Sequence, residues 1–342
     1  MKIRRLRGAR FYLVLLAVLA AGMILKEIAV PALVRSRLIS AAQDGCKTCV
    51  LSLDRVQISL LPLALSSRGV SFSRGEPGAT VISFDAERVY VPFSLLPLFK
   101  SRLRAGRIEI TRPVVTVTQG ELGIPPAGAA GAARQTDLEI EGIDVKQGSF
   151  IYLREHSGRT GSLKVSGISA AAGPAGSSAR LRGKEAQVSA DGLLAESGKF
   201  RLKVRARLFA ESPDADVELS LAEQDLSAFN PFLGPNDGIK LSGQLIEARG
   251  SAAIRGAGLK ASVYARYRGL KIRIKKNEER SAFSAFLQTS LAPLTVGKQN
   301  ADGGHYDRVG TAELERKPGE TLAGFTLRGM KEAALRVFSQ AR

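Results

Sequence analysis

Hydrophobic and polar residues alternate with a period of two along most of the chain after residue 50. In the stretch 199–210, Phe200, Leu202 and Val204 stand at even positions with lysine or arginine between them. Because successive side chains of a strand point to opposite faces, this alternation predicts strands with one apolar and one basic face. The expected strands are 50–61, 63–73, 80–93, 106–119, 137–155, 161–170, 184–195, 199–210, 215–224, 238–254, 259–276, 284–297, 308–317 and 321–329.

Helical periodicity is scarce, and it predicts only short helices. We expect them at 35–45, 95–103, 225–234 and 330–342, with Asp225 as the N-cap of the third. Glycine, serine, asparagine and aspartate fill the gaps between the expected strands, as short turns require. The pattern therefore predicts a mainly β protein, built as a long antiparallel sheet with short connections.

The composition limits how such a sheet could be covered. Aromatic residues make up 6% of the chain, and there is no tryptophan. A compact sandwich of this size would usually bury more aromatic bulk, so a single sheet with one apolar face is worth considering. That face must be covered, and lipid is one candidate because the predicted helices are few.

The N-terminal segment predicts a membrane anchor at residues 1–34. A basic stretch over 1–10 precedes 15 uncharged residues that include Phe11, Leu16 and Leu25. Fifteen helical residues span only about 22 Å, but extension to residue 34 gives about 36 Å, enough to cross a bilayer. A cleavable signal peptide is the alternative, because its apolar core is normally about 7–15 residues long.

An uncleaved anchor would fix the location of the rest of the chain. The positive-inside rule places residues 1–10 in the cytoplasm and the bulk of the chain in the periplasm of a bacterium. The formal net charge of +18 then calls for anions outside the cytoplasm. Phospholipid headgroups and other envelope phosphates fit that location, whereas nucleic acid does not.

The two cysteines, Cys46 and Cys49, form a Cys-Lys-Thr-Cys motif. A local disulfide in an oxidising compartment is the first interpretation, and two free thiols or a redox centre are the alternatives. With only two histidines, a four-ligand zinc site cannot be built from cysteine and histidine alone. We find no constellation of catalytic residues, so we expect no enzymatic activity, no metal and no cofactor.

A segment rich in glycine, alanine and proline at 120–136 interrupts the strand pattern. It predicts a flexible linker or a protruding loop between an N-terminal β region, 35–119, and a second β region, 137–342. The predicted strands on its two sides show the same alternation of apolar and polar residues, so the segment need not separate two domains.

Two segments, 50–73 and 86–117, resemble the N-terminal region of the AsmA-like family. The matching features are Leu61-Pro62-Leu63 followed by Gly69-Val70, and Arg112-Pro113-Val114-Val115 after two alternating stretches. The segments 225–254 and 264–279 are similar to later elements of these proteins. The order and spacing of these features are more specific than any single motif, and the chain is shorter than the best-known members.

The resemblance implies a lipid-handling protein of the bacterial inner membrane that projects into the periplasm. Members of the family are related to bridge-like lipid-transfer proteins, whose elongated curved sheet forms an open hydrophobic groove for acyl chains. The implied function is transfer of phospholipid or glycolipid in outer-membrane biogenesis, and the implied partners are envelope lipid, the inner membrane and other envelope proteins. The resemblance supplies no catalytic residues.

The expected groove residues follow from the alternation together with this resemblance. They are Phe200, Leu202, Val204, Leu208, Leu270, Ile272 and Ile274. Lys203 and Arg205 would face water on the opposite side. An ordinary protein core under the same residues is the alternative, in which case the chain would be an assembly factor that binds envelope proteins through its sheet.

Overall fold

The structure of the chain is a computed structural model that describes residues 30–46, 48–75, 79–94, 102–120, 137–156, 158–176, 178, 180–181, 183–207, 214–274 and 309–339. The predicted anchor lies mostly outside these residues, as do the linker, the strand at 284–297 and most of the short helix at 95–103. Within the described part of the chain, no helix is long and apolar enough to span a membrane.

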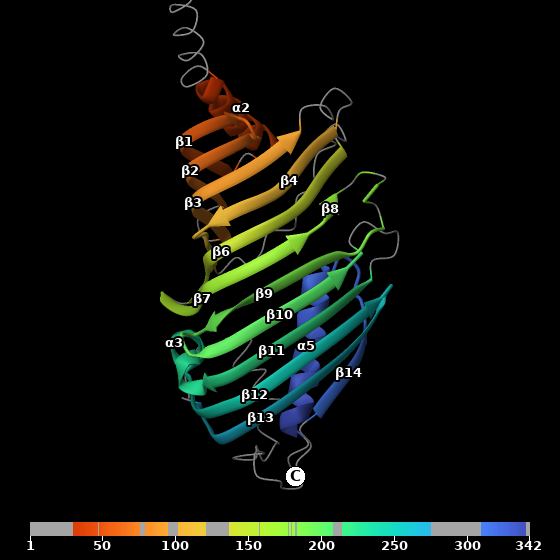
Figure 1. Cartoon of the computed structure of the whole chain (residues 1–342). Coiled ribbons are helices and arrows are strands. Elements are labelled where there is room, and N and C mark those ends of the chain that lie inside the picture. Colours follow the sequence, from red (N-terminus) through yellow and green to blue (C-terminus); the bar gives the residue numbers. More distant parts are fainter. Residues whose placement is uncertain are drawn as a thin grey trace, which may run out of the picture.

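One large curved sheet dominates the described residues, and Figure 1 shows its strands stacked along the long axis of the molecule. The strands are β1 (Cys49–Leu60), β2 (Leu63–Arg74), β3 (Val81–Ser94), β4 (Arg102–Thr111), β5 (Val114–Gln119), β6 (Asp137–His156), β7 (Arg159–Gly173), β8 (Ala175–Gly176), β9 (Ala186–Leu194), β10 (Gly198–Ala206), β11 (Ala215–Asp225), β12 (Ile239–Arg255), β13 (Gly258–Ile274) and β14 (Val309–Glu315). They follow one another in chain order, except that β5 pairs with β3 and β6 and that β8 pairs with β6. The prediction of a mainly β chain with few helices is confirmed.

The predicted strand 106–119 is wrong as a single element, because the chain breaks it into β4 and β5. Pro113 has no N–H for the ladder, and Arg112 before it adopts a left-handed conformation with φ of 48°. Both β4 and β5 pair with β6 in parallel, so the all-antiparallel prediction is also wrong at these two pairs. These pairings make the sheet continuous across the segment 120–136.

The helices of the described chain lie at three places on the sheet. Helix α2 (Val30–Gly45) contacts β1, at the end of the sheet opposite β13 and β14 (Figure 1). A 3-10 turn, η3 (Leu226–Phe229), leads into α3 (Asn230–Asp237), and the Asp225 side chain caps it by accepting a hydrogen bond from the Ser227 N–H. Helix α3 packs against β6, β7 and β12.

The fourth helix, α5 (Leu322–Ser339), corrects the sequence prediction, because 321–329 is helical rather than a strand. Phe325 and Ala333 on this helix are completely buried. They form the main core of the molecule with residues of β10 to β14, including Ala252, Ile254 and Leu259. The chain therefore supplies its own cover for one part of the sheet.

Glycines allow α5 to lie unusually close to the strands. A Cβ atom built on Gly310 of β14 would come within 2.0 Å of the Ala333 carbonyl oxygen. One on Gly250 of β12 would lie 2.7 Å from Met330 Sδ, and one on Gly329 would lie 2.3 Å from a methyl carbon of Leu259. The small residues of the C-terminal strands are thus needed for packing against this helix.

We predict that Gly310→Ala lowers the free energy of unfolding by about 1–3 kcal/mol, because the new methyl group clashes with the backbone of α5. The control is Gly258→Ala in the neighbouring strand, whose Cβ would meet nothing closer than 3.7 Å. The control should stay within about 0.5 kcal/mol of the parent chain. Chemical denaturation followed by circular dichroism measures both, and equal effects would contradict the packing described here.

Candidate functional site: the apolar face of the sheet

The strand register brings the alternating apolar residues onto one face of the sheet. Leu202 of β10 is directly opposite Ala190 of β9 and Leu219 of β11. Because directly paired residues point to the same side, the pairing can be followed from strand to strand. The face defined in this way, called the apolar face below, includes Ile110, Val115, Val145, Phe150, Val165, Ala170, Val188, Ala190, Phe200, Leu202, Val204, Val217, Leu219, Leu221, Gly250, Ala252, Ala261 and Ala312.

The apolar face has a covered zone and an open zone. Under α5, Ala252, Ala261 and Ala312 are at most 4% exposed. From β6 to β11, outside the contacts of α5, the aliphatic and aromatic side chains are only half-buried, and Leu219 is 40% exposed. The open zone is defined here by Val145, Phe150, Val165, Ala170, Ala190, Phe200, Leu202, Leu219 and Leu221.

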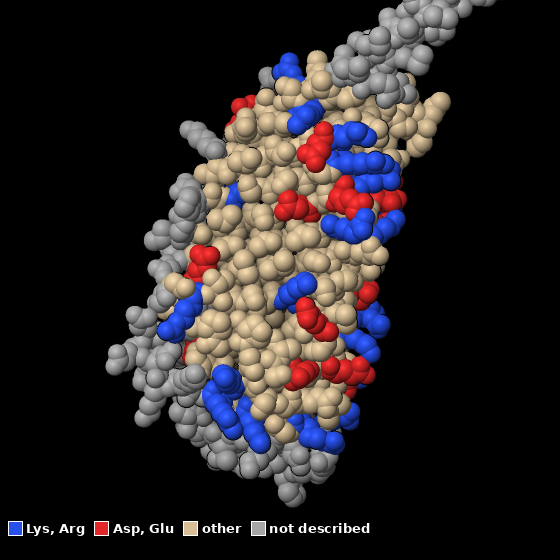
Figure 2. Space-filling view, turned by 90° about the vertical axis from the view of Figure 1, so that its left-hand side faces the viewer, with Lys and Arg blue, Asp and Glu red and all other residues tan. Residues whose placement is uncertain are grey.

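The opposite face of the sheet carries the charged residues and is called the charged face below. Ion pairs cross from strand to strand, with 2.8 Å between Arg107 Nη1 and Asp144 Oδ1 and 2.9 Å between Lys146 Nζ and Glu109 Oε2. The hydrogen bond with Glu109 raises the pKa of Lys146. In Figure 2 many charged side chains lie along the right-hand margin, and others lie near the centre and at the lower left, around areas with few charges. The two faces therefore differ sharply in polarity.

The sequence-predicted groove residues fall into different environments. Phe200 and Leu202 are half-buried in the open zone, whereas Val204 packs against the core beneath α5. Leu270 is only 8% exposed, and Ile272 is half-buried. Ile274 ends β13, and Leu208 lies outside the described residues, as do Phe11, Leu16 and Leu25. Lys203 and Arg205 are exposed on the charged face.

The sequence prediction did not name several residues that share the open zone with Phe200 and Leu202. Phe150, Val165, Leu219 and Leu221 all lie in predicted strands with the same alternation. The alternation of apolar and polar residues in each of these strands, considered as in 199–210, predicts the same apolar face for them. The cover provided by α5 could not be found in this way, because half of the helix was predicted as a strand.

The cysteine pair lies between α2 and the sheet. Cys46 follows α2, Cys49 is the first residue of β1, and the structure joins them in a disulfide. The Cys49 N–H also donates a hydrogen bond to the Cys46 carbonyl oxygen, at 3.0 Å. The bridge closes the turn that connects the helix to the first strand.

Helix α5 is fixed to the sheet by an ionic clasp at its N-terminal end. Arg328 of the helix donates two hydrogen bonds to the Glu320 carboxylate, at 2.9 and 2.7 Å, and the Lys317 N–H donates a third at 3.0 Å. These bonds, led by that from Arg328, lower the pKa of Glu320 to about 2. Arg328 Nη2 also donates to the Glu315 carbonyl oxygen at the end of β14.

The two faces of the sheet are the features of the described residues that bear on function. No group of three or more histidine, cysteine, aspartate or glutamate residues in the described ranges could hold a metal ion. Comparison of the chain with known protein families and with curated proteins finds no match.

We predict that the clasp makes the stability of the chain sensitive to acid. Because the folded pKa of Glu320 lies below its usual value, the clasp stabilises the folded state at neutral pH. This contribution should fade as the pH falls from 4.5 towards 2. In Glu320→Gln, the deficit in melting temperature relative to the parent should be largest above pH 5 and should shrink in acid.

The control for this experiment is Glu313→Gln, which removes an exposed carboxylate 3.2 Å from Lys260 on the charged face. Surface pairs of this kind contribute little to stability, so the control should differ little from the parent at any pH. A deficit for Glu320→Gln that does not change with pH would contradict the role given to the carboxylate.

Proposed function

We propose that the chain is a membrane-anchored protein of the bacterial envelope that binds lipid acyl chains on the open zone and helps to transfer phospholipid or glycolipid. One observation carries the proposal: half-buried aliphatic and aromatic side chains continue from β6 to β11 outside the contacts of α5. An aqueous protein rarely leaves such a strip without an apolar partner. The resemblance to AsmA-like proteins favours lipid as that partner.

The dimensions of the strip suit an acyl chain. The five neighbouring strands from β6 to β11 extend for about 19 Å at the usual spacing of about 4.8 Å between strands. One leaflet of a bilayer contributes about 15 Å of hydrocarbon, half of a core of about 30 Å. The strip therefore has room for an acyl chain lying across the strands, with the charged face turned to water.

The ends of the sheet give the proposal a direction. The predicted anchor precedes α2, and α2 contacts β1, so we place β1 next to the inner membrane and the later strands further into the periplasm. At the far end, α5 occupies the apolar face over β12 to β14. Lipid that moves along the open zone would leave it before this helix.

We predict that Leu219→Asp lowers the amount of lipid that copurifies with the full chain by about tenfold, because an ionised carboxylate is costly to place against acyl chains. Leu193→Asp is the matched control. Leu193 is 38% exposed, against 40% for Leu219, but it pairs with Lys199 and so lies on the charged face. The control should retain the lipid of the parent chain.

The measurement is lipid mass spectrometry on chains purified in dodecyl maltoside, with circular dichroism to show that both variants are folded. Equal lipid content in the two folded variants would contradict binding on the open zone. A parent chain without lipid that copurifies with an envelope protein instead would favour the assembly-factor alternative.

A further inference from the structure

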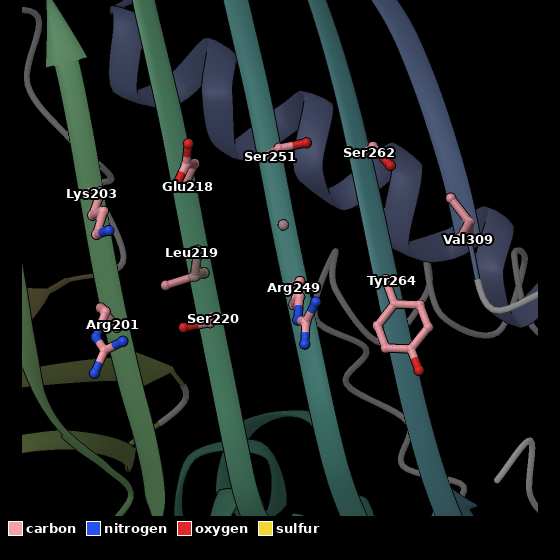
Figure 3. A pocket seen from close by; sticks show the side chains of 11 residues that line it. Arg201, Lys203, Glu218, Leu219, Ser220, Arg249, Ser251, Ser262, Tyr264 and Val309 are labelled. Carbon is pink, nitrogen blue, oxygen red and sulfur yellow. The ribbon is translucent and has the colours of Figure 1, made fainter.

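The charged face contains a hollow that lipid binding on the apolar face does not explain. Its volume is about 440 Å³, and β10 to β14 line it on the side of the sheet away from α5 (Figure 3). The residues that line it are Arg201, Lys203, Glu218, Leu219, Ser220, Arg249, Gly250, Ser251, Ser262, Tyr264 and Val309.

The hollow exists because short side chains lie between long ones. The register sets one row of four residues across β10 to β13, Arg201, Ser220, Arg249 and Tyr264. A second row is formed by Lys203, Glu218, Ser251 and Ser262. Short serine side chains therefore stand between the long side chains of both rows. Figure 3 shows Arg201 and Lys203 together on one strand at the side of the hollow.

Two of the bases in the wall form no ion pair within the described residues, although the register places Asp191 opposite Arg201 and Glu218 opposite Lys203. Arg249 is paired with Glu247 at 2.6 Å, and Arg205 lies 3.7 Å from Glu218. Arg201 and Lys203 are exposed and form no ion pair with any residue that the structure describes. As residues i and i+2 on one strand, their Cα atoms are separated by about 6.7 Å, so their like charges add in the same place.

The combination of bases and hydroxyl groups fits one class of ligand. A guanidinium and an ammonium donate charge-assisted hydrogen bonds to the oxygens of a phosphate, and serine hydroxyls donate further bonds. The Glu218 carboxylate has no donor for a phosphate, but it can accept hydrogen bonds from hydroxyl groups attached to the phosphate. The Tyr264 hydroxyl can donate to a phosphate oxygen or accept from such a hydroxyl group. The volume also exceeds what a bare phosphate needs.

We propose that the hollow binds the phosphate ester of a polyol, with Arg201, Lys203 and the serine hydroxyls holding the phosphate and Glu218 accepting from a polyol hydroxyl. The ester group is shared by glycerol-based lipid headgroups and by free polyol phosphates. The Arg201, Lys203 and Glu218 side chains lie on the other face of the sheet from the open zone, and Leu219 of β11 borders both.

The test uses the full chain in dodecyl maltoside, a detergent without phosphate, with glycerol 3-phosphate as the probe in isothermal titration calorimetry. We expect saturable binding that Arg201→Gln with Lys203→Gln weakens about tenfold or more. The control is Lys240→Gln with Arg273→Gln, which removes two exposed charges from paired positions elsewhere on the sheet. The control should bind as tightly as the parent chain.

Two outcomes would overturn the site. One is an absence of saturable binding by the parent chain, and the other is an equal loss in the two double variants, which would reflect net charge alone. Inorganic phosphate should bind more weakly than glycerol 3-phosphate, and Glu218→Gln should remove this preference. An equal affinity for both probes in the parent chain would overturn the polyol part of the proposal.

Dihexanoyl phosphatidylglycerol, a soluble short-chain lipid, distinguishes the two sources of the ester. Tighter binding than glycerol 3-phosphate, lost in the Arg201 and Lys203 double variant, would assign the hollow to a lipid headgroup. Weaker binding would assign it to a free polyol phosphate. Val165→Asp, in the open zone but outside the lining of the hollow, should lower the copurifying lipid and leave binding of glycerol 3-phosphate unchanged, so failure of the lipid proposal and failure of this one can be told apart.

Discussion

A single layer of paired strands with one apolar face is the constraint on which the rest of the structure depends. The described strands pair mainly with their neighbours in the chain, so the alternation within each strand continues across the sheet. Such a layer satisfies its backbone hydrogen bonds but leaves half of its side chains without a second layer. What covers the apolar face therefore decides both stability and function.

Among the described residues, α5 covers the apolar face at one end of the sheet, and α3 packs against β6, β7 and β12. Where the strands present glycine and alanine, α5 approaches closely and buries them, and its clasp through Arg328 and Glu320 fixes the helix to its connecting loop. Towards the middle of the sheet the side chains become larger, as at Phe150, Phe200 and Leu202, and they stay half-buried. The change from small to large residues along one face marks the border between protein-covered sheet and the surface proposed for lipid.

Much of the fold could be predicted from the sequence, because alternation is a local signal. The strands on both sides of Leu61-Pro62 were found in this way, and the Asp225 cap was predicted from its position before a short helical pattern. The helix at 321–329 was missed because Gly324 and Gly329 weaken its helical signal, and only contact with Leu259 shows why a glycine belongs there. The parallel pairs with β6 depend on how the chain returns to the sheet, which no local pattern encodes.

The two candidate sites also differ in how far they could be predicted from the sequence. The open zone follows from periodicity, although its limit at α5 does not. The hollow on the charged face could not be predicted, because Arg201, Ser220 and Tyr264 come together only through the register of four strands. One sheet could thus serve two kinds of contact, apolar on one face and anionic on the other, without a deep cavity between them.

The most direct test of the account is photo-crosslinking in intact cells, with a benzoylphenylalanine placed at Leu219 or at Leu193. The two positions are similarly exposed but lie on opposite faces of the sheet. The account predicts that position 219 captures lipid, detected by mass spectrometry of the crosslinked chain, and that position 193 does not. Capture of protein alone at position 219, or equal capture of lipid at both positions, would contradict it.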